Sequence, residues 1–285
     1  AGKTTTINIL TGLARADDGT IEIDGQDCTR NPKAAQHLIG IVPDESNLYP
    51  ELTGFDNLCF CAALYGIKKE ERIKSARQLL EDFGLTEAGG RKFAGYSKGM
   101  KRKLTIAAGL IHKPSILFLD EPTTGIDVAS ARQIRQLIQD LHRNGTTIFL
   151  TTHYIEEAER LCERIAFIVG GRIVLVESVA HLLQPLQKQQ VLLMAVPGLD
   201  QQRVHQLAQT FPDLQAQMVD QNQLRVEANA PIPLAPLVNY LADRNLDVLE
   251  ARSLRPSLED VFVKVTGLQA DIMKKEKERN GGGGQ

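Results

Sequence analysis

The chain has 285 residues, of which 42% are hydrophobic and 24% are charged, and its formal net charge is −2. This length accommodates one large domain or two modest ones, and the composition is ordinary for a globular protein. The near-neutral charge gives no reason to expect a nucleic-acid binder. No apolar run is long enough to span a bilayer, and the first residues lack the apolar region and cleavage site of a signal peptide.

The spacing of the four cysteines indicates free thiols. Cys28, Cys59, Cys61 and Cys162 form no C-x-x-C pair, and such pairs are the usual sign of a metal site or a redox motif. We therefore expect reduced, structural thiols in a cytosolic protein.

The first residues match the end of a phosphate-binding loop. The chain opens on Ala1-Gly2-Lys3-Thr4-Thr5-Thr6, which fits the last part of G-x-x-x-x-G-K-[ST] and the helix that follows it. In such a loop the glycine lets backbone N–H groups close on phosphate, the lysine reaches the β- and γ-phosphate oxygens, and the hydroxyl binds Mg²⁺. We expect these roles for Gly2, Lys3 and Thr4, with Thr5 also at the nucleotide. A full loop begins with an earlier glycine and a strand, so we expect a fragment of a longer protein and leave open whether the fragment alone is active.

The pattern then changes from short strands to helices. Turn signals bracket a short strand over 20–23, and a second strand is expected over 38–42. From 53 to 112 apolar residues recur on one face at helical spacing, and another helix is expected over 128–144. This order predicts an α/β domain with a helical insertion.

Two continuous apolar runs each end in polar residues. Residues 116–119 lead into Asp120 and Glu121, and residues 147–150 lead towards His153. Such runs are typical of strands buried on both faces of a parallel sheet, whose ligands bind beyond the carboxyl ends of the strands. We expect Asp120 to hold Mg²⁺ and Glu121 to orient or deprotonate the attacking water. Together with the phosphate loop, these strand ends favour an ATPase.

The last third of the chain has a different character. After a hairpin over 165–176, strands are expected at 191–196, 214–219, 222–228 and 246–251, with helices at 201–210 and 234–244. This βαββαβ order suits a small ferredoxin-like domain. It carries no cluster of catalytic residue types, so we expect a regulatory or dimerisation role. Residues 268–285 form a charged, glycine-rich flexible tail or an artificial addition.

A set of motifs follows in unbroken order. Tyr96-Ser97-Lys98-Gly99-Met100 precedes Asp120-Glu121-Pro122-Thr123-Thr124-Gly125-Ile126-Asp127, and His153 comes after them. With the Gly-Lys-Thr start, these motifs resemble the nucleotide-binding cassette of an ABC transporter over roughly residues 1–178. The run Ser257-Leu258-Glu259-Asp260-Val261-Phe262 resembles the segment that closes bacterial drug-exporter-type ATPases.

The resemblance implies that two cassettes enclose two ATP molecules between the phosphate loop of one and the signature motif of the other. Ser97, Lys98 and Gly99 would then approach the γ-phosphate across the dimer. Asp127 would lie in the loop that communicates between the two sites, and His153 would contact the γ-phosphate. The helices over 53–83 resemble the part that grips the membrane subunit.

The sequence departs from the family pattern at three positions. Lys98 and Met100 replace the usual glycine and glutamine of the signature. Asp44 stands where the family usually carries a glutamine that senses Mg²⁺ and the attacking water. Because aspartate is a good Mg²⁺ ligand, we expect Asp44 to bind the metal together with Thr4 and Asp120.

Basic residues gather at the start of the helix that follows the signature. The helix dipole disfavours cations there by about 0.3–1 kcal/mol each, and a docked anion would offset that cost. A solvated basic face is the alternative. The cations are Lys98, Lys101, Arg102 and Lys103.

We therefore expect an α/β P-loop NTPase cassette in residues 1–180, with a parallel-sheet core, an antiparallel part, a helical subdomain over about 53–112 and no opening strands. An α+β ferredoxin-like domain is expected over 190–267. The expected function is an ATP-hydrolysing subunit of an ABC exporter, with ATP and Mg²⁺ as ligands. Its expected partners are a second cassette, identical or not, and a separate multi-span permease at the cytoplasmic face of the membrane, with no nucleic acid. The alternatives are a soluble ABC ATPase outside transport and a regulatory ATP-binding module.

Overall fold

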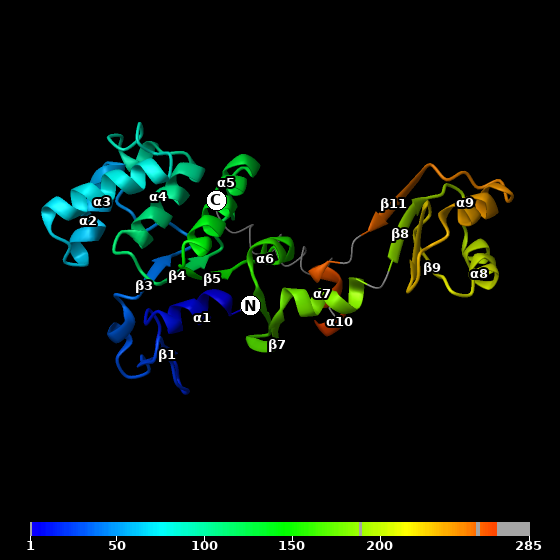
Figure 1. Cartoon of the computed structure of the whole chain (residues 1–285), viewed down its shortest axis with the longest axis horizontal. Helices are drawn as coiled ribbons and strands as arrows, with labels where there is room; N and C mark the ends of the chain where they lie inside the picture. Colours follow the sequence, from blue (N-terminus) through cyan, green and yellow to red (C-terminus); the bar gives the residue numbers. More distant parts are fainter. Residues whose placement is uncertain (1, 188–189, 255–256, 267–285) are drawn as a thin grey trace, which may run out of the picture. The chain divides into compact units, whose positions relative to one another are not determined.

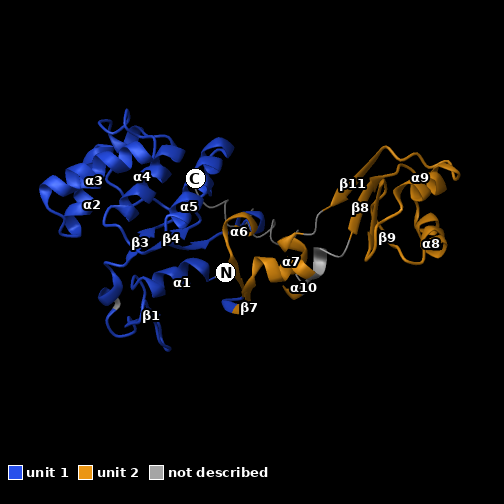
Figure 2. Ribbon diagram, viewed as in Figure 1, with its two compact units in different colours: residues 1–157, 170–172 blue, residues 158–169, 173–285 orange. Residues whose placement is uncertain are grey.

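The computed structural model describes residues 2–187, 190–254 and 257–266, which divide into two compact units (Figures 1 and 2). The first unit extends to Glu157 and includes Gly170–Arg172, and the second contains Ala158–Val169 and the chain from Ile173 onward. The expected tail over 268–285 lies outside the described residues. The expected domain limit at residue 180 stays a prediction.

A parallel sheet forms the centre of the first unit. Strands β3 (Ile39–Val42), β4 (Ile116–Asp120) and β5 (Thr147–Thr151) lie in the order β3-β4-β5, and both neighbouring pairs are parallel. The sequence prediction of a parallel sheet is therefore confirmed, and it places the ends of β4 and β5 side by side, with Asp120 paired to Thr151.

The two apolar strands differ in burial, and the prediction that both are buried on both faces is wrong for β5. Strand β4 is buried from Leu117 to Asp120, whereas β5 alternates, and Phe149 is 40% exposed. Strand β4 is the central strand of this sheet, and β5 lies at its edge among the described residues.

Helices pack on this sheet and carry the site residues. Helix α1 (Lys3–Leu10) shares a buried cluster with β4 through Ile7 and Phe118. Helix α4 (Lys98–Leu110) lies so close to β3 that a Cβ on Gly40 would sit 2.2 Å from the carbonyl oxygen of Gly109. Helix α5 (Val128–Arg143) follows β4 and connects to β5.

The remaining elements of the first unit are shorter or peripheral. The expected helical region contains two further helices and a 3-10 turn, and the early strand is a minimal hairpin. These elements are α2 (Gly54–Leu64), α3 (Lys69–Asp82), η2 (Phe93–Gly95), β1 (Glu22–Ile23), β2 (Gln26–Asp27) and η1 (Pro32–Ala35). The four cysteines form no disulfide in the described part of the chain.

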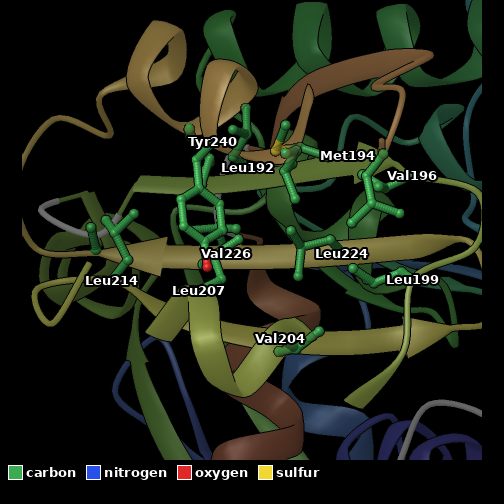
Figure 3. Close-up of a cluster of buried hydrophobic side chains, with 14 residues drawn as sticks. Leu192, Met194, Val196, Leu199, Val204, Leu207, Leu214, Leu224, Val226 and Tyr240 are labelled. Carbon is green, nitrogen blue, oxygen red and sulfur yellow. The ribbon is translucent and has the colours of Figure 1, made fainter. Parts of the chain in front are cut away.

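The second unit contains an antiparallel four-stranded sheet with two helices. Its elements are β8 (Gln190–Ala195), α8 (Gln201–Thr210), β9 (Gln215–Asp220), β10 (Gln223–Ala228), α9 (Leu234–Ala242) and β11 (Glu250–Leu254). The strands lie in the order β11-β8-β10-β9. Met194 and Leu224 lie in the buried cluster of this unit and are fully inaccessible to solvent (Figure 3).

The last strand of this sheet corrects the sequence prediction. It begins at Glu250, whereas a strand over 246–251 was expected. Leu246 is 2% exposed and belongs to the buried cluster, so its side chain anchors the connection after α9 rather than a strand.

Other elements of the second unit lie outside this sheet. Strands β6 (Arg164–Val169) and β7 (Arg172–Ser178) form a two-stranded sheet, followed by α7 (Val179–Gln187). Helix α10 (Leu258–Thr266) contains the end of the Ser-Leu-Glu-Asp-Val-Phe segment, and its Phe262 packs edge-on against Phe167 at 5.1 Å. Helix α6 (Ile155–Leu161) begins in the first unit and ends in the second.

Candidate functional site

Glu121 has an unusual backbone at the end of β4. Its φ is +50°, a left-handed conformation that costs a residue other than glycine about 1–3 kcal/mol and is concentrated at functional sites. Two backbone hydrogen bonds hold it there, from Glu121 N to Thr151 O at 3.0 Å and from Thr124 N to Glu121 O at 3.2 Å. The neighbouring strand thus fixes the direction in which the glutamate side chain leaves the sheet.

The Glu121 carboxylate joins three segments of the chain. Its Oε1 lies 2.8 Å from Nζ of Lys3, and its Oε2 lies 2.6 Å from Nδ1 of His153 and accepts from the Thr124 hydroxyl at 3.1 Å. Burial by itself would raise the pKa of Glu121. The hydrogen bond and charge of Lys3, with contributions from His153 and Thr124, outweigh burial and lower the pKa below its ordinary value. The carboxylate is therefore ionised at neutral pH, and Nδ1 of His153 donates the hydrogen bond.

Asp120 is a buried carboxylate beside this cluster. Its side chain accepts a hydrogen bond from the Thr151 hydroxyl, and the residue is 3% exposed. Thr4 and Thr5 are exposed on the first turn of α1, and Gly2 takes a φ of +91° just before that helix, a conformation that glycine adopts readily. Among the described residues, no group of three or more His, Cys, Asp or Glu side chains could hold a metal by itself. The carboxylate of Asp120 and the hydroxyl of Thr4 are ligands of the kind that bind Mg²⁺ together with nucleotide phosphates.

Asp44 follows β3 in a region rich in negative charge. Partial burial raises its pKa, the charge of Arg102 lowers it, and the carboxylates of Asp120, Glu121 and Glu45 raise it further, so that the net pKa is above the ordinary value. The neighbouring carboxylates make a divalent cation favourable at this place, because a cation would relieve their mutual repulsion.

The buried guanidinium of Arg102 was missed by sequence reasoning. The sequence pattern groups this residue with cations that would face a docked anion or, alternatively, solvent. Neither applies to Arg102, which is 7% exposed and donates hydrogen bonds to backbone carbonyls of two loops. Lys98 is exposed, and the ammonium of Lys101 lies 5.6 Å from the centre of the Phe93 ring. That an anion docks beside these lysines stays a prediction. The one signal in the sequence is residue type, because Arg102 is the only arginine among the four cations at the start of α4.

Glu157 is a second residue that sequence reasoning missed. It is 5% exposed, and its Oε1 accepts a hydrogen bond of 2.6 Å from the hydroxyl of Thr123, two residues after Glu121. Its Oε2 is buried and has no hydrogen-bond partner among the described residues. Glu157 therefore holds the loop after β4 from the side of α6.

The signature residues and Asp127 lie at the beginnings of two neighbouring helices. The Ser97 hydroxyl accepts from Met100 N at 3.2 Å and caps α4, while the Asp127 carboxylate accepts from Ser130 N at 2.9 Å and caps α5. A Cβ on Gly99 would lie 2.3 Å from Oγ of Ser130, so only glycine fits between the two helices. The structure thus groups Lys3, Glu121 and His153 in one cluster and places the signature residues and Asp127 beside one another.

The site combines a helix that begins at Gly-Lys-Thr with the acidic end of a strand in a parallel sheet. This combination defines a P-loop nucleoside triphosphatase. Comparison with known proteins narrows this class. A protein-family profile described as "ABC transporter" matches residues 1–124. The chain is 34% identical over 270 residues to the linearmycin resistance ATP-binding protein of Bacillus subtilis, covering 94% of this chain and 86% of that protein.

Two further similarities, to a second relative and to a solved structure, also indicate an ABC ATP-binding protein. The daunorubicin/doxorubicin resistance ATP-binding protein of Streptomyces peucetius is 33% identical over 280 residues, which cover 97% of this chain and 84% of that protein. A dimeric ATP-binding cassette solved in a post-hydrolysis state with ADP and phosphate is 28% identical, with a TM-score of 0.57 over 62% of this chain and 81% of that one. The chain therefore belongs to the ABC transporter family, as an ATP-binding subunit with ATPase activity. In the described part of the chain, no helix is long and apolar enough to cross a membrane.

Proposed function

We propose that this chain powers export by hydrolysing ATP at the Lys3–Glu121–His153 cluster, and that a separate permease forms the path across the membrane. The observation that carries the proposal is the Glu121 carboxylate, held in a left-handed backbone conformation with one oxygen at Lys3 and the other at His153. A general base must be ionised and fixed in direction, and this arrangement meets both requirements. The names of the two relatives describe resistance to linearmycin and to daunorubicin and doxorubicin, and on that ground we propose export as the function of this chain.

The proposed chemistry assigns one role to each segment. Backbone N–H groups after Gly2 and the ammonium of Lys3 bind the phosphates, with Thr5 beside them. Thr4, Asp120 and Asp44 would hold Mg²⁺, which supplies charge stabilisation to the transferring phosphoryl group when bound. Glu121 accepts the proton of the attacking water, and His153 holds the carboxylate through Nδ1 while its ring contacts the γ-phosphate.

The second half of each site comes from another cassette. Ser97, Lys98 and Gly99 lie at the N-terminus of α4, where backbone N–H groups and the helix dipole favour an anion. We propose that they bind the γ-phosphate held by a partner chain, and that Asp127, at the neighbouring helix start, lies at the same dimer interface. ATP binding closes the two cassettes, and hydrolysis reopens them.

An apolar surface on α2 is proposed to contact the permease. Tyr49 is 50% exposed and stands edge-on to Phe60 at 5.1 Å, and Leu64 is 71% exposed. The buried side chain of Asn57 holds the preceding loop on α2, since it accepts from Tyr49 N at 2.8 Å and donates to Tyr49 O at 3.0 Å and Thr53 O at 3.0 Å. A rigid apolar surface of this kind suits a protein partner. The chain would thereby sit at the cytoplasmic face of the membrane.

The sheet of the second unit is proposed to form a ferredoxin-like accessory domain over 190–267. Its βαββαβ element order and antiparallel sheet support this assignment. We propose a regulatory or dimerisation role for it, because its sequence shows no cluster of catalytic residue types.

The test compares full-length wild type with Glu121→Gln and a matched control, Glu87→Gln, at an exposed position. Glu121→Gln should lower the steady-state ATPase rate by at least 100-fold, within the range of a general base, and should retain binding of a fluorescent ATP analogue. Glu87→Gln should behave as wild type. An active Glu121→Gln enzyme would contradict the assignment of the base.

A pull-down of Glu121→Gln from detergent-solubilised membranes, with and without Mg-ATP, tests the partner. Recovery of a multi-span membrane protein supports the transporter function. Recovery of ribosomes or nucleic-acid proteins instead would favour a soluble ABC ATPase. ATP binding by wild type without turnover would favour a regulatory module.

A further inference from the structure

Arg102 is a buried cation to which the proposed chemistry assigns no role. It lies on the second turn of α4 and is 7% exposed. Its Nε donates to Pro122 O at 3.0 Å, its Nη1 donates to Asp44 O at 3.0 Å and also to Pro43 O, and its Nη2 donates to Asp120 O. One guanidinium therefore binds four backbone carbonyls.

These carbonyls belong to the two loops that carry the proposed catalytic carboxylates. Pro43 and Asp44 follow β3, while Asp120 and Pro122 flank Glu121 at the end of β4. Carbonyls at strand ends have left the sheet ladder and need other donors when buried. A guanidinium presents its N–H groups in a rigid planar fork and can serve both loops at once, whereas an ammonium is a single point charge.

The charge of Arg102 also suits its surroundings. Burial lowers the pKa of its guanidinium, while the carboxylates of Asp44, Asp120, Glu121 and Glu157 act in the opposite direction. A guanidinium remains charged under these conditions. It therefore offsets the mutual repulsion of carboxylates that converge at the strand ends.

The same helix begins with the signature residues. Ser97 caps α4, and Gly99 lies in its first turn, three residues before Arg102. A single continuous helix therefore links the signature residues to the guanidinium, and the guanidinium links that helix to both loops.

We propose that Arg102 is a positioning residue that couples the signature end of α4 to the loops of Asp44 and Glu121 within one chain. Contact of a partner-bound ATP with Ser97 and Gly99 would then set the geometry of this chain's own hydrolytic site. The inference rests on the proposed function, because it assumes ATP at both places.

The test uses full-length protein with Arg102→Gln, Arg102→Lys and the control Lys103→Gln, which removes a cation from the next position of the same helix. We expect Arg102→Gln to lower kcat at least tenfold and to lower Tm, because buried carbonyls lose their donor. KM and the affinity for a fluorescent ATP analogue should stay close to those of Lys103→Gln. Arg102→Lys retains the charge but cannot bridge both loops, so it should also lose most of kcat.

Three results would overturn the inference: unchanged kcat in Arg102→Gln, full activity in Arg102→Lys, or a loss of kcat matched by an equal loss of ATP affinity. If Arg102→Gln does not fold, kcat and ATP affinity of Arg102→Lys are compared with those of Lys103→Gln by the same criteria. If neither Arg102 variant folds, the role of Arg102 is purely structural. Wild type without ATPase activity would contradict the proposed function itself. Active wild type with unaffected variants would contradict only the coupling.

Discussion

The ammonium of Lys3 lies 2.8 Å from a carboxylate oxygen of Glu121, although 118 residues separate the two along the chain. The phosphate-loop lysine and the proposed base are thus direct partners. Because the same ammonium is proposed to bind the β- and γ-phosphates, an entering nucleotide competes with Glu121 for it and leaves the carboxylate freer to accept a proton.

Replacing Lys3 with alanine tests this relationship. Lys3→Ala should weaken ATP binding by about 10–100-fold, the equivalent of one charge-assisted hydrogen bond of about 1.5–3 kcal/mol. Titration with a fluorescent ATP analogue measures the affinity. Lys33→Ala, at an exposed position, should leave it unchanged. Equal affinities for wild type and Lys3→Ala would exclude a phosphate contact by Lys3.

Gly99 and Ser130 leave no room for a side chain between α4 and α5. A Cβ on Gly99 would lie 2.3 Å from Oγ and 2.7 Å from Cβ of Ser130. Gly99→Ala should therefore destabilise the protein by about 1–3 kcal/mol through overpacking, as measured by urea unfolding followed by circular dichroism.

Two further variants make this prediction specific. Ser130→Gly removes both atoms in the way, so the double variant with Gly99→Ala should recover most of the loss. Gly90→Ala is the control, because a Cβ there meets no atom within 4 Å. Additive effects of Gly99→Ala and Ser130→Gly would refute the steric explanation.

The contact between Thr123 and Glu157 should stabilise the loop after β4. Glu157→Ala leaves the buried Thr123 hydroxyl without its acceptor and should cost about 1–3 kcal/mol of unfolding free energy. Glu157→Gln retains an acceptor oxygen and should lie within about 1 kcal/mol of wild type. Thr123→Val combined with Glu157→Ala should cost less than the sum of the single changes, and a strictly additive result in urea unfolding would argue against the contact.

Asp44 provides the test of the metal assignment. If its carboxylate binds Mg²⁺, Asp44→Ala should raise the Mg²⁺ concentration needed for half-maximal ATPase activity by about tenfold. The neighbouring exposed Glu45 is a matched control, and Glu45→Ala should change this half-maximal Mg²⁺ concentration little. An unaltered Mg²⁺ dependence and rate in Asp44→Ala would mean that aspartate does not replace the usual glutamine in function.

Local sequence determined the elements and the chemistry of their ends. The apolar run of β4 followed by Asp120 and Glu121 predicted a buried parallel strand with an acidic end, because a strand inside a sheet needs apolar residues on both faces. The helical spacing over 53–112 predicted α2, α3 and α4, since one face of each must be buried. These features depend on residues that are close in sequence, so a pattern can reveal them.

Only the tertiary structure decided which polar side chains are buried and what they bind. Arg102 stands among Lys98, Lys101 and Lys103 in the sequence, yet it alone of these four is buried, because the carbonyls of two distant loops come within reach of its guanidinium. Glu157 likewise meets Thr123 only because the loop after β4 and helix α6 are brought together by folding. Sequence therefore determined where the chemical groups stand along the chain, and long-range packing decided which of them touch.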